Sequence, residues 1–159
     1  MGGPILITVD HTAELASFVG QELGISGWLT IDENMVKSFG RITGDTHWMH
    51  MDAERVRVET PFREIIAHGF LVLAIITGLS GQCYAVRGAR RWLNYGIDRV
   101  RFPASVQAGS RLRLRLTLIA LEPQKTGTRL RLGCTMELEA SERPAAVCEW
   151  ICIAFEDAE

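Results

Sequence analysis

The sequence predicts a single α+β domain in which one apolar helix packs against an antiparallel sheet. Three features predict this class: an uncharged apolar run at 68–82, alternating strand patterns beyond residue 90, and short turns between those strands. Strands joined by short turns pair antiparallel, and an apolar helix is stable only when another layer covers it. With 159 residues and no repeat or linker, residues 1–159 are expected to form one domain.

The first half of the chain carries the shorter helical signals. Residues 12–22 have helical character and are followed by glycines that end it. A second helix is predicted after Asp32, which can cap its first turn, and Gly44 ends it. Residues 53–59 predict one or two further turns before Thr60-Pro61. The apolar positions that recur at helical spacing in the second helix are Met35, Val36, Phe39 and Ile42.

The run at 68–82 is the predicted central helix. It holds no charged residue and is apolar all round, which is expected when the rest of the protein encloses a helix. It is too short and too interrupted by glycine to span a bilayer.

The second half of the chain predicts strands. Residues 111–118 alternate strictly between leucine and polar side chains, and residues 130–138 repeat that pattern beyond a connector at 123–127. Residues 92–102 supply another strand. Residues 147–155 are apolar on both faces, as expected inside a sheet or at a subunit interface.

Composition excludes several function classes. The formal net charge is −2 and 47% of residues are hydrophobic, so neither nucleic acid nor a membrane surface is an expected partner. The apolar run Ile5-Leu6-Ile7 is too short for a signal peptide, which predicts a cytoplasmic protein. Of the four cysteines, Cys148 and Cys152 would lie about 13 Å apart on one strand, too far for a disulfide, so buried thiols are expected.

The densest group of chemically active residues lies between Thr43 and Phe70. Asp45 and His50 are five residues apart, which would place them about 140° apart on a helix and on opposite faces of a strand. Both can reach one substrate only from a loop or a broken helix end. Such segments commonly carry catalytic groups, so the spacing predicts an acid–base pair.

These residues carry a resemblance to a known family. Residues 39–50 read Phe-Gly-Arg-Ile-Thr-Gly-Asp-Thr-His-Trp-Met-His, and residues 67–69 read Ala-His-Gly. The sequence resembles the MaoC-like dehydratases, or R-specific enoyl-CoA hydratases, whose signature has Gly-Asp and the final His in these positions. It looks most similar to the nodulation-protein-N-like branch, which has Trp where others have Pro (Trp48) and a segment like 93–103. The resemblance implies a hotdog fold, an antiparallel sheet wrapped around one central helix.

The resemblance also implies a reaction, the hydration of a trans-2-enoyl thioester or its reverse. Asp45 and His50 would hold the water and transfer protons, and the N–H of Gly69 would donate to the thioester oxygen. His68, His47 and Trp48 are the other residues expected around the substrate. The substrate would be an acyl-CoA or an acyl-carrier-protein thioester, with coenzyme A as part of the substrate and no separate cofactor.

Two positions depart from the family pattern. His47 stands where the signature has Asn, and it either contacts substrate or is a bystander. Val56 replaces a small residue, a change expected to affect packing alone. His68, which precedes the central helix, is expected to be a structural group rather than one that transfers protons. Asp45, His47 and His50 could form a metal triad, but no further ligand pattern supports one, so no metal is predicted.

Other interpretations remain open at this stage. A hotdog thioesterase or an acyl-carrier dehydratase would place a carboxylate on the central helix, and residues 69–82 contain none. A non-catalytic thioester-binding subunit would keep the fold without the reaction. The aromatic residues that could line an acyl tunnel, an interface or the core are Trp48, Trp92 and Tyr95. The open sheet edge predicts a homodimer, with residues 147–155 near the join. The arginines that could either bind phosphate or face solvent are Arg99, Arg101, Arg111, Arg113 and Arg115.

Overall fold

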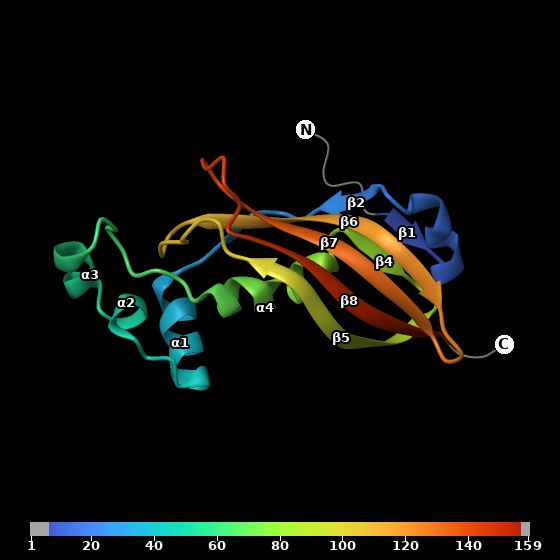
Figure 1. Cartoon of the computed structure of the whole chain (residues 1–159), viewed down its shortest axis with the longest axis horizontal. Coiled ribbons are helices and arrows are strands. Elements are labelled where there is room, and N and C mark those ends of the chain that lie inside the picture. Colours follow the sequence, from blue (N-terminus) through green and yellow to red (C-terminus); the bar gives the residue numbers. More distant parts are fainter. Residues whose placement is uncertain (1–6, 157–159) are drawn as a thin grey trace.

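An antiparallel sheet forms the frame of the protein in the computed structural model, which describes residues 7–156 (Figure 1). Its strands run in the order β2-β6-β7-β8-β5, and β3 also pairs with β6. Strands β1 and β4 form a separate parallel pair. The strand bounds are β1 (Ile7–Val9), β2 (Glu22–Ile25), β3 (Leu29–Thr30), β4 (Tyr84–Val86), β5 (Ala89–Arg101), β6 (Arg111–Pro123), β7 (Thr128–Leu138) and β8 (Ala146–Glu156).

The alternating pattern of β6 and β7 puts one face of the sheet into the core. Leu114 lies opposite Met136 and Leu118 opposite Leu132, and all four side chains are fully buried. The opposite face carries ion pairs between strands, among them Arg113 with Glu137. The other predicted arginines that pair with carboxylates are Arg99 with Glu149, Arg111 with Glu139, and Arg115 with Glu22 and Glu137. Arg101 donates to the backbone oxygen of Val100. These pairs favour the solvent-facing interpretation of the arginine rows.

Helix α4 (Gly69–Ser80) packs against the concave face of the sheet (Figure 1). Its buried face consists of Leu71, Val72, Ile76 and Leu79. The expectation that the helix is enclosed all round is wrong for the single chain, because Phe70 is 71% exposed. The exposed side of α4 instead borders the cavities described below.

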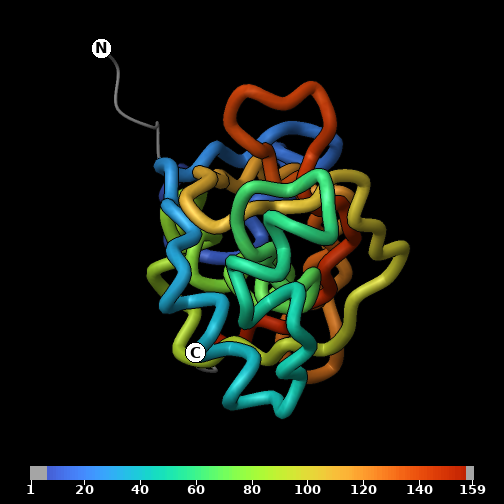
Figure 2. Tube along the Cα trace, turned by 90° about the vertical axis from the view of Figure 1, so that its left-hand side faces the viewer, coloured from blue at the N-terminus to red at the C-terminus, as the bar shows by residue number. Residues whose placement is uncertain are grey.

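Local chemistry explains the short helices that precede α4. Asp32 caps α1 (Glu33–Thr43), where its side chain accepts a hydrogen bond from Met35 N at 2.8 Å, and Gly44 ends the helix with φ of 79°. Ile42 was expected on the buried face of this helix but is 84% exposed. Two more helices follow, α2 (Trp48–Met51) and α3 (Ala53–Glu59). Together the three cover the N-terminal end of α4 (Figures 1 and 2).

Two expectations about the remaining segments need correction. Residues 12–22 form only a 3-10 helix, η1 (Thr12–Phe18), because Gly20 turns the chain with φ of 82° and β2 begins at Glu22. Residues 147–155 lie inside the sheet, as one alternative expected, but not at its edge. Among the strands of residues 7–156, β5 pairs with β8 alone, so β5 forms that edge.

The smaller expectations about packing are confirmed. Cys83, Cys134, Cys148 and Cys152 are all free and buried. Val56 is fully buried within α3. Of the helices in residues 7–156, none is long and apolar enough to cross a membrane.

Candidate active site

Asp45 and His50 come together at a break between two helices. Gly44 reverses the chain after α1, Asp45 follows in the loop, and the short helix α2 carries His50. A carboxylate oxygen of Asp45 and ring nitrogens of His50 and His68 all lie within 4.8 Å of one another. This is the convergence that the five-residue spacing predicted from a broken helix end.

The hydrogen bonding of His50 leaves one ring nitrogen available for catalysis. Its Nδ1 lies 2.6 Å from the backbone oxygen of Ile66. A carbonyl oxygen can only accept, so Nδ1 carries the proton and Nε2 keeps a free lone pair. Burial lowers the pKa of His50 below 6.5, the nearby His68 lowers it further, and the bond to Ile66 partly opposes both. The His50 imidazole is therefore held in its neutral form.

His68 supports both members of this pair. Its ring stacks on that of His50, with centroids 3.7 Å apart and planes 27° from parallel. Its Nε2 donates to the backbone oxygen of Asp45 at 2.9 Å and lies 3.9 Å from the carboxylate. The side chain is only 3% exposed. His68 thus holds the Asp45 loop and the His50 ring in fixed relative positions.

The same three residues make a poor metal site. The structure groups Asp45 with His50 and His68, rather than with His47 and His50. The lone pairs of imidazole lie in the ring plane, so the nearly parallel rings of His50 and His68 direct them side by side rather than at one ion. Two of the four ring nitrogens are also bonded to backbone oxygens. The geometry favours proton transfer over metal binding.

Comparison with known proteins identifies the family. A family model described as the MaoC-like domain matches residues 14–131. The chain belongs to the MaoC-like family. It is 41% identical over 145 residues to 3-hydroxyacyl-thioester dehydratase Z of Mycobacterium tuberculosis, covering 91% of this chain and 95% of that protein. It is 39% identical over 145 residues to nodulation protein N of Rhizobium leguminosarum bv. viciae, covering 89% of each.

Solved structures support the fold assignment of this MaoC-like chain. The unliganded R-hydratase PhaJ1 from Pseudomonas aeruginosa superposes with a TM-score of 0.70 and 26% identity, covering 87% of this chain and 83% of that one. An R-hydratase from A. caviae involved in PHA biosynthesis superposes with a TM-score of 0.65 at 18% identity, covering 79% of this chain and 89% of that one. The expected hotdog fold is confirmed.

Close packing leaves little room for a side chain at two glycines of the MaoC-like site. A Cβ on Gly40, in α1, would lie 2.9 Å from the backbone oxygen of Asp45 and 3.2 Å from His68 Cε1. A Cβ on Gly69 would lie 3.0 Å from the ring of Phe102. Gly69 is the first residue of α4, and the first N–H groups of a helix have no acceptor within it. Its N–H is thus available beside the stacked His50 and His68 rings.

His47 and Trp48 lie at the start of α2. His47 is the N-cap, and its Nδ1 accepts a hydrogen bond from Met49 N at 3.4 Å. The guanidinium of Arg55 lies over the Trp48 ring, 4.4 Å from its centroid. Trp48 packs against the core and does not border the cavities beside α4. The structure therefore gives both residues a local structural role, and their contact with substrate remains a prediction.

The His47→Asn variant, which restores the signature residue, should keep hydratase activity within about threefold of the original. Asparagine is a strong N-cap whose side-chain oxygen can replace Nδ1 as the acceptor from Met49 N, so stability should change by less than about 0.5 kcal/mol. Steady-state kinetics and thermal melting of the two proteins measure both effects. A large gain or loss of activity would show that the imidazole takes part in the reaction.

A cavity of about 670 Å³ opens next to the site, between α4 and β5. Phe39 lines its near end, and the Phe39 ring also lies 5.2 Å from that of His68. The wall is largely apolar and includes Tyr95, one of the three aromatic residues considered for an acyl tunnel. Its other lining residues are Thr43, Phe70, Leu73, Ala74, Ile76, Thr77, Asn94, Gly96, Ile97 and Trp150.

Proposed function

We propose that this protein is a hydro-lyase that interconverts trans-2-enoyl thioesters and 3-hydroxyacyl thioesters. The observation that carries the proposal is the convergence of the Asp45 carboxylate and the His50 imidazole at the start of α4. Membership of the MaoC-like family and the named dehydratase and R-hydratase relatives support it. The adjoining apolar cavity suits an acyl chain.

The geometry suggests how hydration proceeds. A water molecule held by Asp45 and His50 attacks C3 of the enoyl group, and Nε2 of His50 accepts its proton because Nδ1 is bonded to Ile66. Asp45, which enters the step protonated, delivers its proton to C2, and the proton held on His50 then returns to Asp45 so that both groups regain their starting states. One hydroxyl and one hydrogen are thus added across the double bond, and dehydration reverses both transfers. Asp45 is 59% exposed in the single chain, so an apolar enclosure that would favour its protonated form requires substrate or a second subunit.

The start of α4 is positioned to stabilise the charge that develops during this step. Electron density moves onto the thioester oxygen as water attacks. The helix N-terminus carries partial positive charge, and Gly69 N–H is the donor that we assign to this oxygen. A side chain at residue 69 would displace Phe102 and change this approach.

A coupled assay tests the function. Purified protein is mixed with crotonyl-CoA, loss of the enoyl absorbance is followed, and the product is identified as 3-hydroxybutyryl-CoA. Conversion supports the proposal. If enoyl-CoA of every chain length is left unchanged, while acyl-CoA still binds, a non-catalytic binding subunit is the better description. Hydrolysis to free coenzyme A would indicate a thioesterase, although α4 carries no Asp or Glu.

The pH dependence should reflect the neutral state of His50. Protonation removes the Nε2 lone pair, so kcat/KM should fall as pH decreases through the pKa of His50. Because burial lowers that pKa, the acidic midpoint should lie below 6.5. A pH profile of kcat/KM with crotonyl-CoA measures it. A midpoint above 6.5 would contradict the assignment of His50 as the base in the free enzyme.

We also propose that the protein is a cytoplasmic homodimer. Its four free cysteines suit a reducing compartment. The β5 edge exposes Trp92, Leu93, Tyr95 and Ile97 beside unpaired backbone groups, and an apolar edge of this kind is normally covered. Pairing of β5 with β5 of a second copy would cover both edges around a two-fold axis.

Light scattering should therefore give twice the 17.7 kDa mass of the chain. Leu93→Lys should yield a monomer, since it places a charge in the middle of the edge. Val19→Lys is the matched control, because Val19 is 45% exposed and Leu93 50%, but Val19 lies next to the opposite side of the sheet. A monomeric wild type, or a dimeric Leu93→Lys protein, would exclude this interface.

A further inference from the structure

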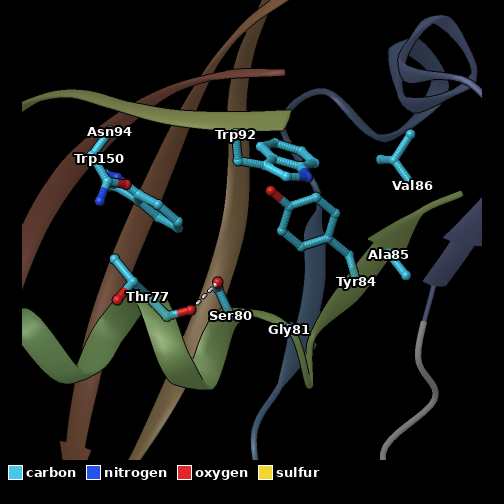
Figure 3. Close-up of a pocket in the computed structure, with 9 residues that line it drawn as sticks. All are labelled: Thr77, Ser80, Gly81, Tyr84, Ala85, Val86, Trp92, Asn94 and Trp150. Carbon is cyan, nitrogen blue, oxygen red and sulfur yellow. Dashed lines mark hydrogen bonds between the residues drawn. The ribbon is translucent and has the colours of Figure 1, made fainter. Parts of the chain in front are cut away.

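A second cavity continues the first along α4. It has a volume of about 480 Å³, and the two cavities share Thr77, Asn94 and Trp150 as lining residues. We call the cavity beside Phe39 the proximal cavity and this second one the distal cavity. The remaining residues that line the distal cavity are Ser80, Gly81, Tyr84, Ala85, Val86 and Trp92 (Figure 3).

The two cavities follow one stripe of α4 away from the catalytic pair. The stripe passes Phe70, Ala74 and Thr77 and ends at Gly81, which are spaced as residues on one helical face. At about 1.5 Å per residue, it spans roughly 16 Å. Because each C–C bond of about 1.5 Å advances an extended chain by roughly 1.3 Å, this length accommodates about twelve carbons.

The chemistry of the wall changes along this path. Half of the residues that line the proximal cavity are Phe, Leu, Ile or Tyr, and its polar residues are Thr43, Thr77 and Asn94. In the distal cavity, Tyr84 presents its hydroxyl group to the space between α4 and β5, opposite Asn94 and Trp92 (Figure 3). Ser80 donates its hydroxyl proton to the backbone oxygen of Thr77 at 2.8 Å, so only its oxygen remains as an acceptor. No charged residue lines either cavity. The far end therefore offers hydrogen bonds but no counter-ion.

Two of these polar groups have unused hydrogen-bonding capacity. The Asn94 amide and the Trp92 indole N–H make no hydrogen bond to another residue within 7–156, and both side chains are exposed to solvent in the single chain. A purely hydrocarbon chain end would displace water from them without replacing its hydrogen bonds, which is unfavourable. A hydroxyl or carbonyl group can replace those bonds. A carboxylate would lose its hydration and find no cation nearby.

We propose that the acyl group of the substrate extends through both cavities and carries a neutral hydrogen-bonding group near its far end, which Asn94 recognises. This inference rests on the proposed hydro-lyase function and adds a substrate class to it. The occupant is a long-chain thioester with a terminal hydroxyl or carbonyl group. Asn94 is the specificity-determining residue because it borders both cavities at the point where the wall becomes polar.

The test compares four enoyl-CoA substrates: crotonyl-CoA, trans-2-dodecenoyl-CoA, its ω-hydroxy derivative and its ω-carboxy derivative. The readout is the ratio of kcat/KM values within each protein, so a general loss of activity does not affect it. Wild type should favour the ω-hydroxy over the unsubstituted chain about tenfold and should use the ω-carboxy chain worst. Asn94→Leu should abolish the preference for the hydroxyl group. Asn34→Leu, on the exposed surface of α1, is the matched control and should keep it.

The outcomes separate this inference from the function on which it rests. Hydration of crotonyl-CoA without a preference among the three long chains would overturn the inference and leave the hydro-lyase intact. A preference that survives Asn94→Leu would overturn the role of Asn94. Failure to hydrate any of the four substrates would overturn the hydro-lyase proposal, and the substrate class with it.

Discussion

Replacing Asp45 with asparagine, or His50 with alanine, is expected to lower kcat/KM for crotonyl-CoA about a thousandfold. Each substitution removes one of the two groups that transfer protons, and general acid–base catalysis contributes about 10² to 10⁴ in rate. The Asp45→Asn protein should keep its fold, because His68 bonds to the backbone oxygen of Asp45 rather than relying on the carboxylate. Steady-state kinetics measures the loss, and circular dichroism checks the fold.

Matched substitutions elsewhere provide the controls. Asp52→Asn makes the same chemical change at the N-cap of α3, where asparagine also caps well, so activity and stability should be kept. His11→Ala makes the second change at an exposed residue, the N-cap of η1. Full activity in both Asp45→Asn and His50→Ala would remove the proposed dyad.

Gly40→Ala is expected to reduce kcat/KM about a hundredfold and to lower the free energy of unfolding by about 1–3 kcal/mol. The new Cβ would lie 2.9 Å from the backbone oxygen of Asp45 and 3.2 Å from both His68 Cε1 and Met51 Sδ. The Asp45 oxygen and the His68 ring are hydrogen-bonded to each other, so relieving the clash moves Asp45 away from His68 and His50. Kinetics and denaturant unfolding of the same preparation measure both losses.

Gly78→Ala is the matched control for this prediction. Gly78 is also helical, in α4, but no atom lies within 4 Å of the position of its Cβ. Alanine should therefore stabilise that helix by about 0.5–1 kcal/mol and leave activity unchanged. Equal effects of the two substitutions would show that crowding at Gly40 does not position the site.

Elements determined by local chemistry were predictable from the sequence. The alternation of leucine with polar residues at 111–118 fixes which side chains of β6 face the core. Asp32 and Gly44 mark both ends of α1 because a cap and a left-handed glycine act within one helical turn. The extended apolar run likewise located α4. In each case the deciding interaction lies within a few residues of the signal.

Features that depend on distant contacts were not predictable in the same way. Helical spacing placed Ile42 on a buried face of α1. Helices α1, α2 and α3 lie beyond the end of α4, however, and this arrangement leaves the Ile42 side of α1 open to solvent. The strand at 147–155 has two apolar faces, a pattern that fits either the interior or an interface. Only the pairing order put it between β7 and β5. Periodicity reports which face is apolar and not which element covers it.

The site shows the same division. Spacing and the family signature identified Asp45 and His50, and the structure brings them together. The stacking of His68 on His50 was missed, because residues 18 positions apart in sequence carry no local sign of ring contact. A glycine at position 40 inside a predicted helix was a usable signal, since such a glycine costs helix stability and commonly reflects close packing.

A crystal structure of the Asp45→Asn protein with bound 3-hydroxybutyryl-CoA tests the central claim most directly. The C3 hydroxyl should lie within hydrogen-bonding distance of both residue 45 and His50 Nε2, and the thioester oxygen should accept from Gly69 N–H. The acyl chain should point along α4 into the proximal cavity. A complex with the C3 hydroxyl away from both side chains, or with the thioester far from Gly69, would contradict the account.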